Sequence, residues 1–220
     1  LKERTKSNYT FIPIIKPGYF HLRDVKLLNK HTKKIIPEYD IKRKNIDKLL
    51  VKSKNNIIII GGATSLYLYN KRIEGRAAHW DSIFVDKISL KYDQSSIEKA
   101  FVNFVKDLSK NNEVILLYPI PEIGVNLQKK KFENMIRIFN YEYSTFFKQN
   151  KEVINLFDAI NKPKIHKVYS YKAFCNETTN LCATHDENNF FFFDGYHPSL
   201  EGARMINNLI MKKIDLLDNN

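Results

Sequence analysis

Glycine and proline are scarce in this sequence of 220 residues, with seven of each. Their scarcity excludes a collagen-like chain and a linker-like chain, which depend on those residues. Long uncharged apolar runs are also absent, and none approaches the roughly 18 residues that a membrane-spanning helix needs. Leu1 to Lys6 lack the pattern of a signal peptide. The sequence does not begin with Met, so we expect it to be a fragment of a longer protein.

Core-forming residues, by contrast, are plentiful. Hydrophobic residues make up 43% of the chain and include 15 Phe and 12 Tyr, and charged residues make up 27%. This composition is ordinary for a packed globular protein and excludes intrinsic disorder. At about 100–200 residues per domain, the length favours one domain, with two small domains as the alternative.

Acidic residues are too few to balance the basic ones, and the net charge is +12. Residues 1–54 hold 15 basic and 5 acidic side chains, whereas residues 173–220 hold 3 basic and 7 acidic ones. A basic end can bind nucleic acid or an anionic membrane surface. However, the basic residues follow no repeating helical face, and no nucleic-acid-binding motif occurs. We therefore attribute the charge to a general enrichment in Lys, Asn and Ile, and we expect no nucleic-acid partner.

Short apolar runs alternate with helical patterns along the chain. Residues 57–60 and 114–118 are apolar throughout and predict strands that are buried on both faces. We expect two more strands at 153–157 and 190–193, a β-prone run at 9–14, and helices at 40–52, 132–147 and 199–214. A further helix has the capping-box spacing, with Ser95 as its N-cap and Glu98 reaching back.

This alternation predicts an α/β fold of the three-layer α/β/α, flavodoxin-like kind, with a parallel sheet covered on both sides by helices. In such folds the chemistry lies at the carboxyl ends of the strands. The residues that directly follow each strand are therefore the candidates for a functional site.

Asp194 and His197 stand three residues apart, between the run at 190–193 and the last helix. A carboxylate that accepts the imidazole Nδ1 proton fixes the tautomer, and Nε2 is then free to take a proton from a nucleophile. Ser199 is a natural N-cap for the helix that follows. Because the bare pattern also arises by chance, an ordinary ion pair in a surface turn is the alternative interpretation.

Cys175 and Cys182 are the only cysteines, and they close a short polar loop. That arrangement favours a disulfide and an oxidising compartment. Two free thiols are one alternative, and half of a zinc site with His185 and His197 is another. Zinc sites prefer tighter cysteine pairs, so we expect no metal.

The pattern formed by Asp194, His197, Ser199, Gly202 and Ala203, preceded by the close cysteine pair, resembles the last block of a known family. That family comprises the SGNH domains fused to membrane acyltransferases of the acyltransferase-3 type. Two other stretches are similar to the family's middle strand and to its strand with a following Pro-x-Pro-Glu turn, namely residues 57–69 and 114–122. The resemblance spans most of the chain.

The resemblance implies a serine esterase-like domain outside the cytoplasmic membrane that moves acyl groups, commonly acetyl, onto cell-surface glycans. Asp194 and His197 match the family's Asp and His, so a serine would attack the acyl carbonyl while His197 acts as base and then as acid. The implied partners are an acyl donor, a glycan acceptor and an N-terminal multi-pass membrane acyltransferase domain. No cofactor is implied.

Two departures from the family pattern stand out. The family's nucleophile lies in a Gly-Asp-Ser motif after its first strand, and this sequence contains no Gly-Asp-Ser. We therefore expect residues 1–220 to form an SGNH-like domain that is incomplete at its N-terminus and lacks the first strand and the serine. After residues 57–60 the family often has an Arg-Trp or Asn-type signature. Gly61 to Ser65 stand there instead, and only Gly62 or Thr64 remain as oxyanion donors.

Two serines of the chain lie near the expected site, Ser65 after a strand and Ser199 beside His197. We expect both to be helix caps, so that this chain alone forms no acyl-enzyme. Two alternative functions follow from the sequence. One is a catalytically dead SGNH-like module that binds a glycan or a partner, and the other is a basic nucleic-acid-binding protein.

Overall fold

The computed structural model of the protein describes residues 9–14, 20–71, 82–127 and 141–219. Its elements follow one another in this order: β1 (Val25–Asn29), α1 (Pro37–Lys52), β2 (Ile57–Ile60), α2 (Thr64–Tyr69), β3 (Ser82–Asp86), α3 (Gln94–Leu108), β4 (Glu113–Leu117), β5 (Tyr141–Glu142), α5 (Tyr143–Ala159), β6 (Ile165–Val168), the 3-10 helix η2 (Ser170–Ala173), β7 (Cys175–Asn176), β8 (Leu181–Cys182) and α6 (Leu200–Asp218).

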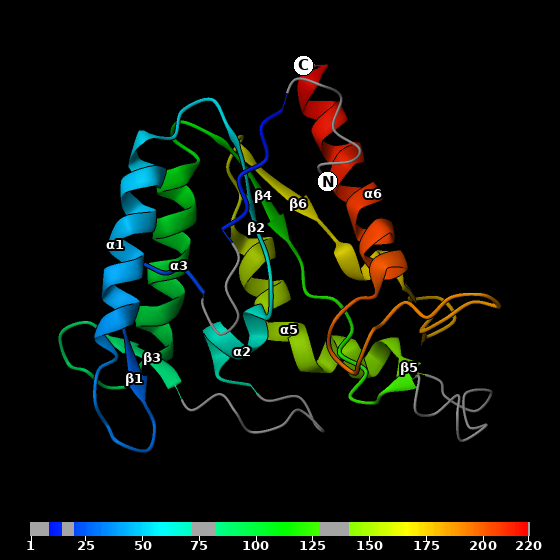
Figure 1. Ribbon diagram of the computed structural model, residues 1–220, viewed down its shortest axis with the longest axis horizontal. Helices are drawn as coiled ribbons and strands as arrows, with labels where there is room; N and C mark the ends of the chain where they lie inside the picture. The colour runs from blue at the N-terminus through cyan, green and yellow to red at the C-terminus, as the bar shows by residue number, and fades with distance from the viewer. Residues whose placement is uncertain (1–8, 15–19, 72–81, 128–140, 220) are drawn as a thin grey trace.

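A parallel sheet of three strands in the order β2-β4-β6 forms the centre of the fold. Figure 1 shows α1 and α3 to one side of these strands and α6 to the other. The predicted α/β class with a helix-flanked parallel sheet is thus confirmed. The central strand β4 buries Val114, Ile115 and Leu116 completely, because it has neighbours on both edges and helices over its faces.

Strand β2 is less buried than the sequence predicts. All four of its isoleucines are only partly buried, although they pack against the core. In the part of the chain that the structure describes, β2 pairs with β4 along one edge and with no strand along the other. The free edge of a hydrophobic strand leaves both its side chains and its backbone groups incompletely covered.

Two small antiparallel sheets complete the architecture, and the sequence predicted neither. Strands β1 and β3 pair over five residues each, from Val25 opposite Asp86 to Asn29 opposite Ser82. Strands β5, β8 and β7 form a three-stranded ribbon of two residues each. Runs this short carry too little periodicity to be recognised as strands.

Helix α3 forms where the capping-box pattern predicts a helix, but it has a different cap. Ile97, Phe101 and Val105 are fully buried, and the ring of Phe101 stacks on that of Phe157 in α5, with centroids 5.3 Å apart. The prediction of Ser95 as N-cap is wrong. The N-cap is Asp93, whose carboxylate accepts a hydrogen bond from the backbone N–H of Ser95 at 3.1 Å.

The strand predicted at 153–157 is wrong, because these residues lie inside α5. Val153, Ile154 and Phe157 are buried at a spacing that suits one helical face, and five residues are too few to distinguish that pattern from a buried strand. The third parallel strand is β6, with sequence IHKV. The helix predicted at 132–147 overlaps the start of α5 at Tyr143, and its residues 132–140 lie outside the described residues.

The run at 190–193 forms only two isolated bridges, Phe190 with His185 and Phe192 with Pro198. Phe192 is fully buried, whereas Phe193 is 64% exposed, so one strand buried on both faces is not what forms here. Residues 9–14 also contain no strand.

The two outer helices were predicted with small errors. Helix α1 starts at Pro37, earlier than predicted, because proline suits the first helical turn. Its lysines at 44, 48 and 52 recur every four residues, so the basic residues do follow a helical face here, contrary to the prediction. In α6 the predicted N-cap Ser199 is confirmed, and Ile206, Ile210 and Ile214 are buried. Leu200, at the first position of the helix, is 70% exposed. Among the described residues, none of the helices combines the length and the apolar character of a membrane span.

Candidate functional site

The loop that leads into α6 is a tight turn closed by backbone hydrogen bonds. The N–H of Phe193 donates to the carbonyl of His197 at 2.8 Å, and the N–H of Ser199 donates to the carbonyl of Phe191 at 2.9 Å. Phe192 anchors the turn in the core, fully buried. The turn therefore holds residues 194–197 in one conformation at the surface of a rigid element.

Asp194 and His197 are hydrogen-bonded to each other. The imidazole Nδ1 lies 2.8 Å from the Asp194 Oδ2. The other carboxylate oxygen, Oδ1, accepts the backbone N–H groups of Tyr196 and His197, both at 2.7 Å. These three bonds fix the carboxylate, and the carboxylate in turn fixes the imidazole. The structure thus brings together the two residues that the sequence predicted as partners.

The electrostatics of Asp194 favour its charged form. Partial burial acts to raise the pKa of Asp194, but the hydrogen bonds from the His197 ring and from two backbone N–H groups outweigh it, so the pKa lies below its usual value. An ionised Asp194 accepts the Nδ1 proton, which leaves Nε2 as the basic nitrogen. The His197 side chain is 70% exposed, and within the described residues Nε2 has no hydrogen-bond partner. The ring can therefore receive a proton from a group that approaches from outside.

The turn that follows β4 packs against the loop of Asp194 and His197. The sequence did not predict this contact. The N–H of Gly124 donates to the carbonyl of Gly195 at 3.0 Å. A Cβ atom on Gly195 would lie 2.8 Å from the Gly124 carbonyl carbon and from the Val125 nitrogen. Only glycine allows this approach of two backbones. The glycine directly after Asp194 was the available signal, but its partner is 71 residues away in the sequence.

Gly202 has a similar role one turn into α6. A Cβ atom there would lie 2.0 Å from the carbonyl oxygen of Phe191. The same residue donates its N–H to the Oγ of Ser199 at 3.1 Å. The absence of a side chain at Gly202 therefore allows the start of α6 to pack closely against residues 190–193.

The predicted oxyanion donors lie at the carboxyl end of β2. Gly62 has a φ of 129°, a conformation that side-chain-bearing residues rarely adopt. Thr64 is completely buried, and its Oγ1 has no hydrogen-bond partner among the described residues. A buried hydroxyl without a partner is unusual and suits a donor that serves a ligand. No hydrogen bond in the described part of the chain joins Gly62 or Thr64 to His197.

Neither serine near the site has a free hydroxyl. The prediction that Ser65 caps a helix is wrong, because the N-cap of α2 is Ala63. The hydroxyl of Ser65 donates to the Oδ1 of buried Asn150 at 2.6 Å. The hydroxyl of Ser199 donates to the carbonyl of Phe190 at 2.5 Å while it caps α6. Both are engaged in structural hydrogen bonds.

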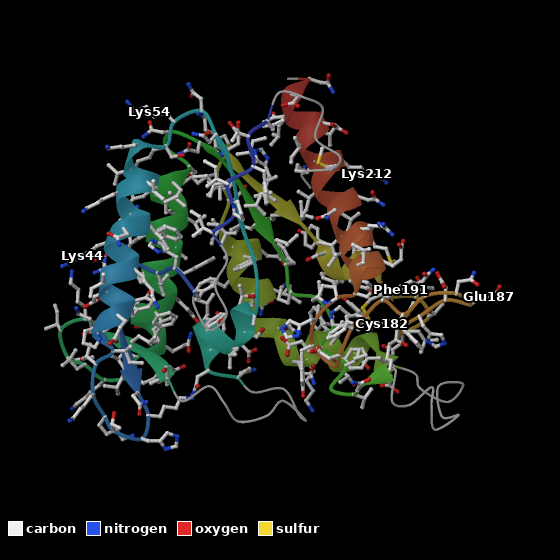
Figure 2. All side chains as sticks on the ribbon, viewed as in Figure 1. Lys44, Lys54, Cys182, Glu187, Phe191 and Lys212 are labelled. Atoms are coloured by element: carbon white, nitrogen blue, oxygen red, sulfur yellow. A yellow bond between two sulfur atoms is a disulfide. The ribbon has the colours of Figure 1, made fainter. Side chains whose placement is uncertain are left out.

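Cys175 and Cys182 are joined by a disulfide between paired strands β7 and β8. Their sulfur atoms therefore offer no thiolate to a zinc ion. In Figure 2 Cys182 lies at the same end of the molecule as Phe191. The backbone connects them, because the N–H of Phe191 donates to the carbonyl of Thr184 at 2.9 Å.

Comparison with protein families places the chain. The model of the family described as "SGNH domain (fused to AT3 domains)" matches residues 5–212. Comparisons with curated proteins and with solved structures gave no significant match. The family match covers every described element from β1 to β8, the turn that holds Asp194 and His197, and α6 as far as residue 212.

Proposed function

Since the chain belongs to the family of SGNH domains fused to AT3 domains, we propose that it is the serine esterase or O-acyltransferase domain of a membrane-bound enzyme. The acyl group is acetyl in the simplest case, and the acceptor is a cell-surface polysaccharide or peptidoglycan. The domain works on the extracytoplasmic side of the membrane, next to an N-terminal multi-pass acyltransferase domain that supplies the acyl donor.

In the proposed mechanism, His197 is the general base and Asp194 orients it. Nε2 takes the hydroxyl proton of a serine as its Oγ forms a bond to the acyl carbonyl carbon. The resulting oxyanion receives hydrogen bonds, for which Gly62 and Thr64 are the candidate donors. The imidazolium then returns its proton to the leaving oxygen as the old ester bond breaks. A glycan hydroxyl or water repeats these steps in reverse and takes the acyl group from the serine.

The nucleophilic serine is proposed to come from a segment outside this sequence. The sequence contains no Gly-Asp-Ser, and the hydroxyls of Ser65 and Ser199 are engaged elsewhere. Among the described residues no strand pairs with the outer edge of β2, and its four isoleucines are only partly covered, which supports a strand added there. A parallel strand beside β2 would end at the same edge of the sheet as Gly62 and Thr64.

The Asp194–His197 hydrogen bond is the observation that carries this proposal. A catalytically dead binding module remains the rival, since such a module could keep the pair as a structural remnant. The two proposals differ in whether a serine of the full-length protein reacts with an acyl group.

A fluorophosphonate probe and p-nitrophenyl acetate test this difference on the full-length protein. We expect labelling of one serine upstream of Leu1, ester turnover, and loss of about 10³-fold or more of kcat in His197→Ala. His31→Ala, on an exposed turn far along the chain, is the matched control and should keep the activity. A full-length protein that neither reacts with the probe nor cleaves the ester would favour the binding module.

A further inference from the structure

The outward face of α1 carries aliphatic side chains in contact with solvent. Ile41, Leu49 and Val51 are 61%, 60% and 69% exposed. Of the 16 residues of the helix, only Tyr39 is buried. A helix on the outside of a domain normally turns its large aliphatic residues inward. Here three of them lie on the side that faces away from the core.

Lysines lie among these aliphatic residues. Lys44, Lys48 and Lys52 are exposed and recur at four-residue intervals, so at 3.6 residues per turn they share one side of the helix with Ile41 and Leu49. Figure 2 shows Lys44 projecting from α1 away from the rest of the molecule. We call the face formed by Ile41, Lys44, Lys48, Leu49, Val51 and Lys52 the lysine face.

The carboxylates of α1 do not neutralise the lysine face. Asp40 forms ion pairs with Lys26 and Arg43, and Asp47 with Arg23 and Arg43. Both acids thus bind cations on the inner side of the helix. Within the described residues, none of the three lysines of the face has an ion pair, and Glu38 in the first turn is the only other acid on the helix. The positive charge of the face is therefore available to an anionic partner.

We propose that the lysine face docks the domain on an anionic lipid bilayer. Lysines near a negatively charged bilayer are attracted to its surface, and aliphatic side chains between them enter the boundary between headgroups and acyl chains. A soluble polyanion such as nucleic acid would use the lysines but would leave Ile41, Leu49 and Val51 in water. The combination of both residue types on one face thus favours a lipid surface over a polyanion.

The charge distribution of the chain also favours an orientation in which α1 faces the anionic bilayer. The C-terminal part of the chain has an acidic excess, with 7 acidic against 3 basic residues over 173–220. Glu187 lies at the end of the molecule opposite to Lys44 (Figure 2). An anionic surface would attract the α1 end and repel the other. Docking by α1 therefore leaves the loop of Asp194 and His197 accessible.

Vesicle co-sedimentation of the 220-residue chain tests the proposal. We expect binding to vesicles of equal parts phosphatidylglycerol and phosphatidylcholine, little binding to pure phosphatidylcholine, and weaker binding as salt rises. The variant Lys44→Gln/Lys48→Gln/Lys52→Gln should lose about 100-fold in partition coefficient, at roughly fivefold for each lysine. The variant Ile41→Ser/Leu49→Ser should lose about tenfold.

The matched control removes the same charge elsewhere. Lys148, Lys151 and Lys212 are exposed on α5 and α6, and their triple change to Gln should reduce binding by threefold or less. Circular dichroism establishes that each variant is folded. Three results would overturn the proposal: no binding to anionic vesicles, equal losses in the control triple, or full binding by the Ile41→Ser/Leu49→Ser variant. The last result would identify the face as a site for a soluble polyanion.

Discussion

Gly195 lies against Gly124 with their backbones in direct contact, joined by an N–H to carbonyl hydrogen bond of 3.0 Å. This contact connects the turn after β4 to the turn that holds Asp194 and His197. Two segments far apart in the sequence thus form one rigid support for the imidazole. Preorganised supports of this kind matter because a displacement of about 1 Å at a catalytic group can cost roughly 10²-fold in rate.

The Gly195→Ala variant should therefore lose activity without losing its fold. The new methyl would meet two backbone atoms at 2.8 Å, and the turn must shift to make room. We expect kcat for ester cleavage by the full-length protein to fall about 10²-fold, with KM nearly unchanged. Asn188→Ala, in a neighbouring exposed turn, should leave kcat as it is. An unaltered kcat in Gly195→Ala would mean that this contact does not position His197.

The Asp194→Asn variant tests the orientation of the imidazole. An amide can still accept the two backbone N–H groups through its Oδ1, but its Nδ2 then donates toward His197 Nδ1 and favours the wrong tautomer. We expect kcat to fall by about 10²–10⁴-fold with little change in KM. Steady-state kinetics and a urea unfolding curve separate this effect from a loss of folding. A near-normal kcat in Asp194→Asn would mean that Asp194 and His197 form only an ordinary surface ion pair.

The pH dependence of stability reports on the same carboxylate. Because the pKa of Asp194 is lower in the folded protein than its usual value, the ionised form stabilises the fold at pH values above the unfolded-state pKa. This contribution is lost as pH falls through the folded-state pKa. The difference in unfolding free energy between the wild type and Asp194→Asn should thus be larger at pH 7 than at pH 3. Urea denaturation at both values measures it, and a pH-independent difference would contradict the assigned direction.

The features that the sequence predicted correctly are those with a local pattern. The apolar runs at 57–60 and 114–118 became neighbouring parallel strands, and the Asp194–His197 pair lies within a single turn. The predictions were wrong where tertiary contacts determine the secondary structure. Residues 153–157 became part of a helix because Phe157 packs on Phe101 and Tyr118, a context that a five-residue window does not contain.

The contacts that position the site could not be predicted from the sequence, because they also depend on tertiary packing. No periodicity joins Gly124 to Gly195, and the burial of Thr64 depends on how α2 packs. Even the N-cap of α3 was misassigned by two residues, because Asp93 and Ser95 are both good caps and only the backbone conformation distinguishes them. The exposed lysine spacing in α1 was visible in the sequence but was obscured by the many other basic residues.

Ser199→Ala should separate a structural serine from a catalytic one. Ser199 caps α6 and its hydroxyl also bonds to the carbonyl of Phe190. Removal of an N-cap hydroxyl costs about 0.5–2 kcal/mol, so we expect a loss of unfolding free energy of that size. The kcat of the full-length enzyme should stay within about threefold of the wild type, since the serine is not the nucleophile. A loss of activity beyond 10³-fold at unchanged stability would instead make Ser199 the nucleophile.

The disulfide should contribute to the stability of the loop that precedes the site. Cys175 and Cys182 are seven residues apart, and the chain-entropy model assigns about 2–3 kcal/mol to a loop of this length. We expect Cys175→Ser/Cys182→Ser to unfold at lower urea by about that amount. Dithiothreitol should destabilise the wild type similarly and leave the double variant unaffected, which makes the variant its own control.

Because Thr184, two residues beyond Cys182, accepts the N–H of Phe191, local opening should also expose residues 190–193. Hydrogen exchange at Phe191 that does not speed up on reduction would show that the disulfide and the Asp194–His197 turn are independent.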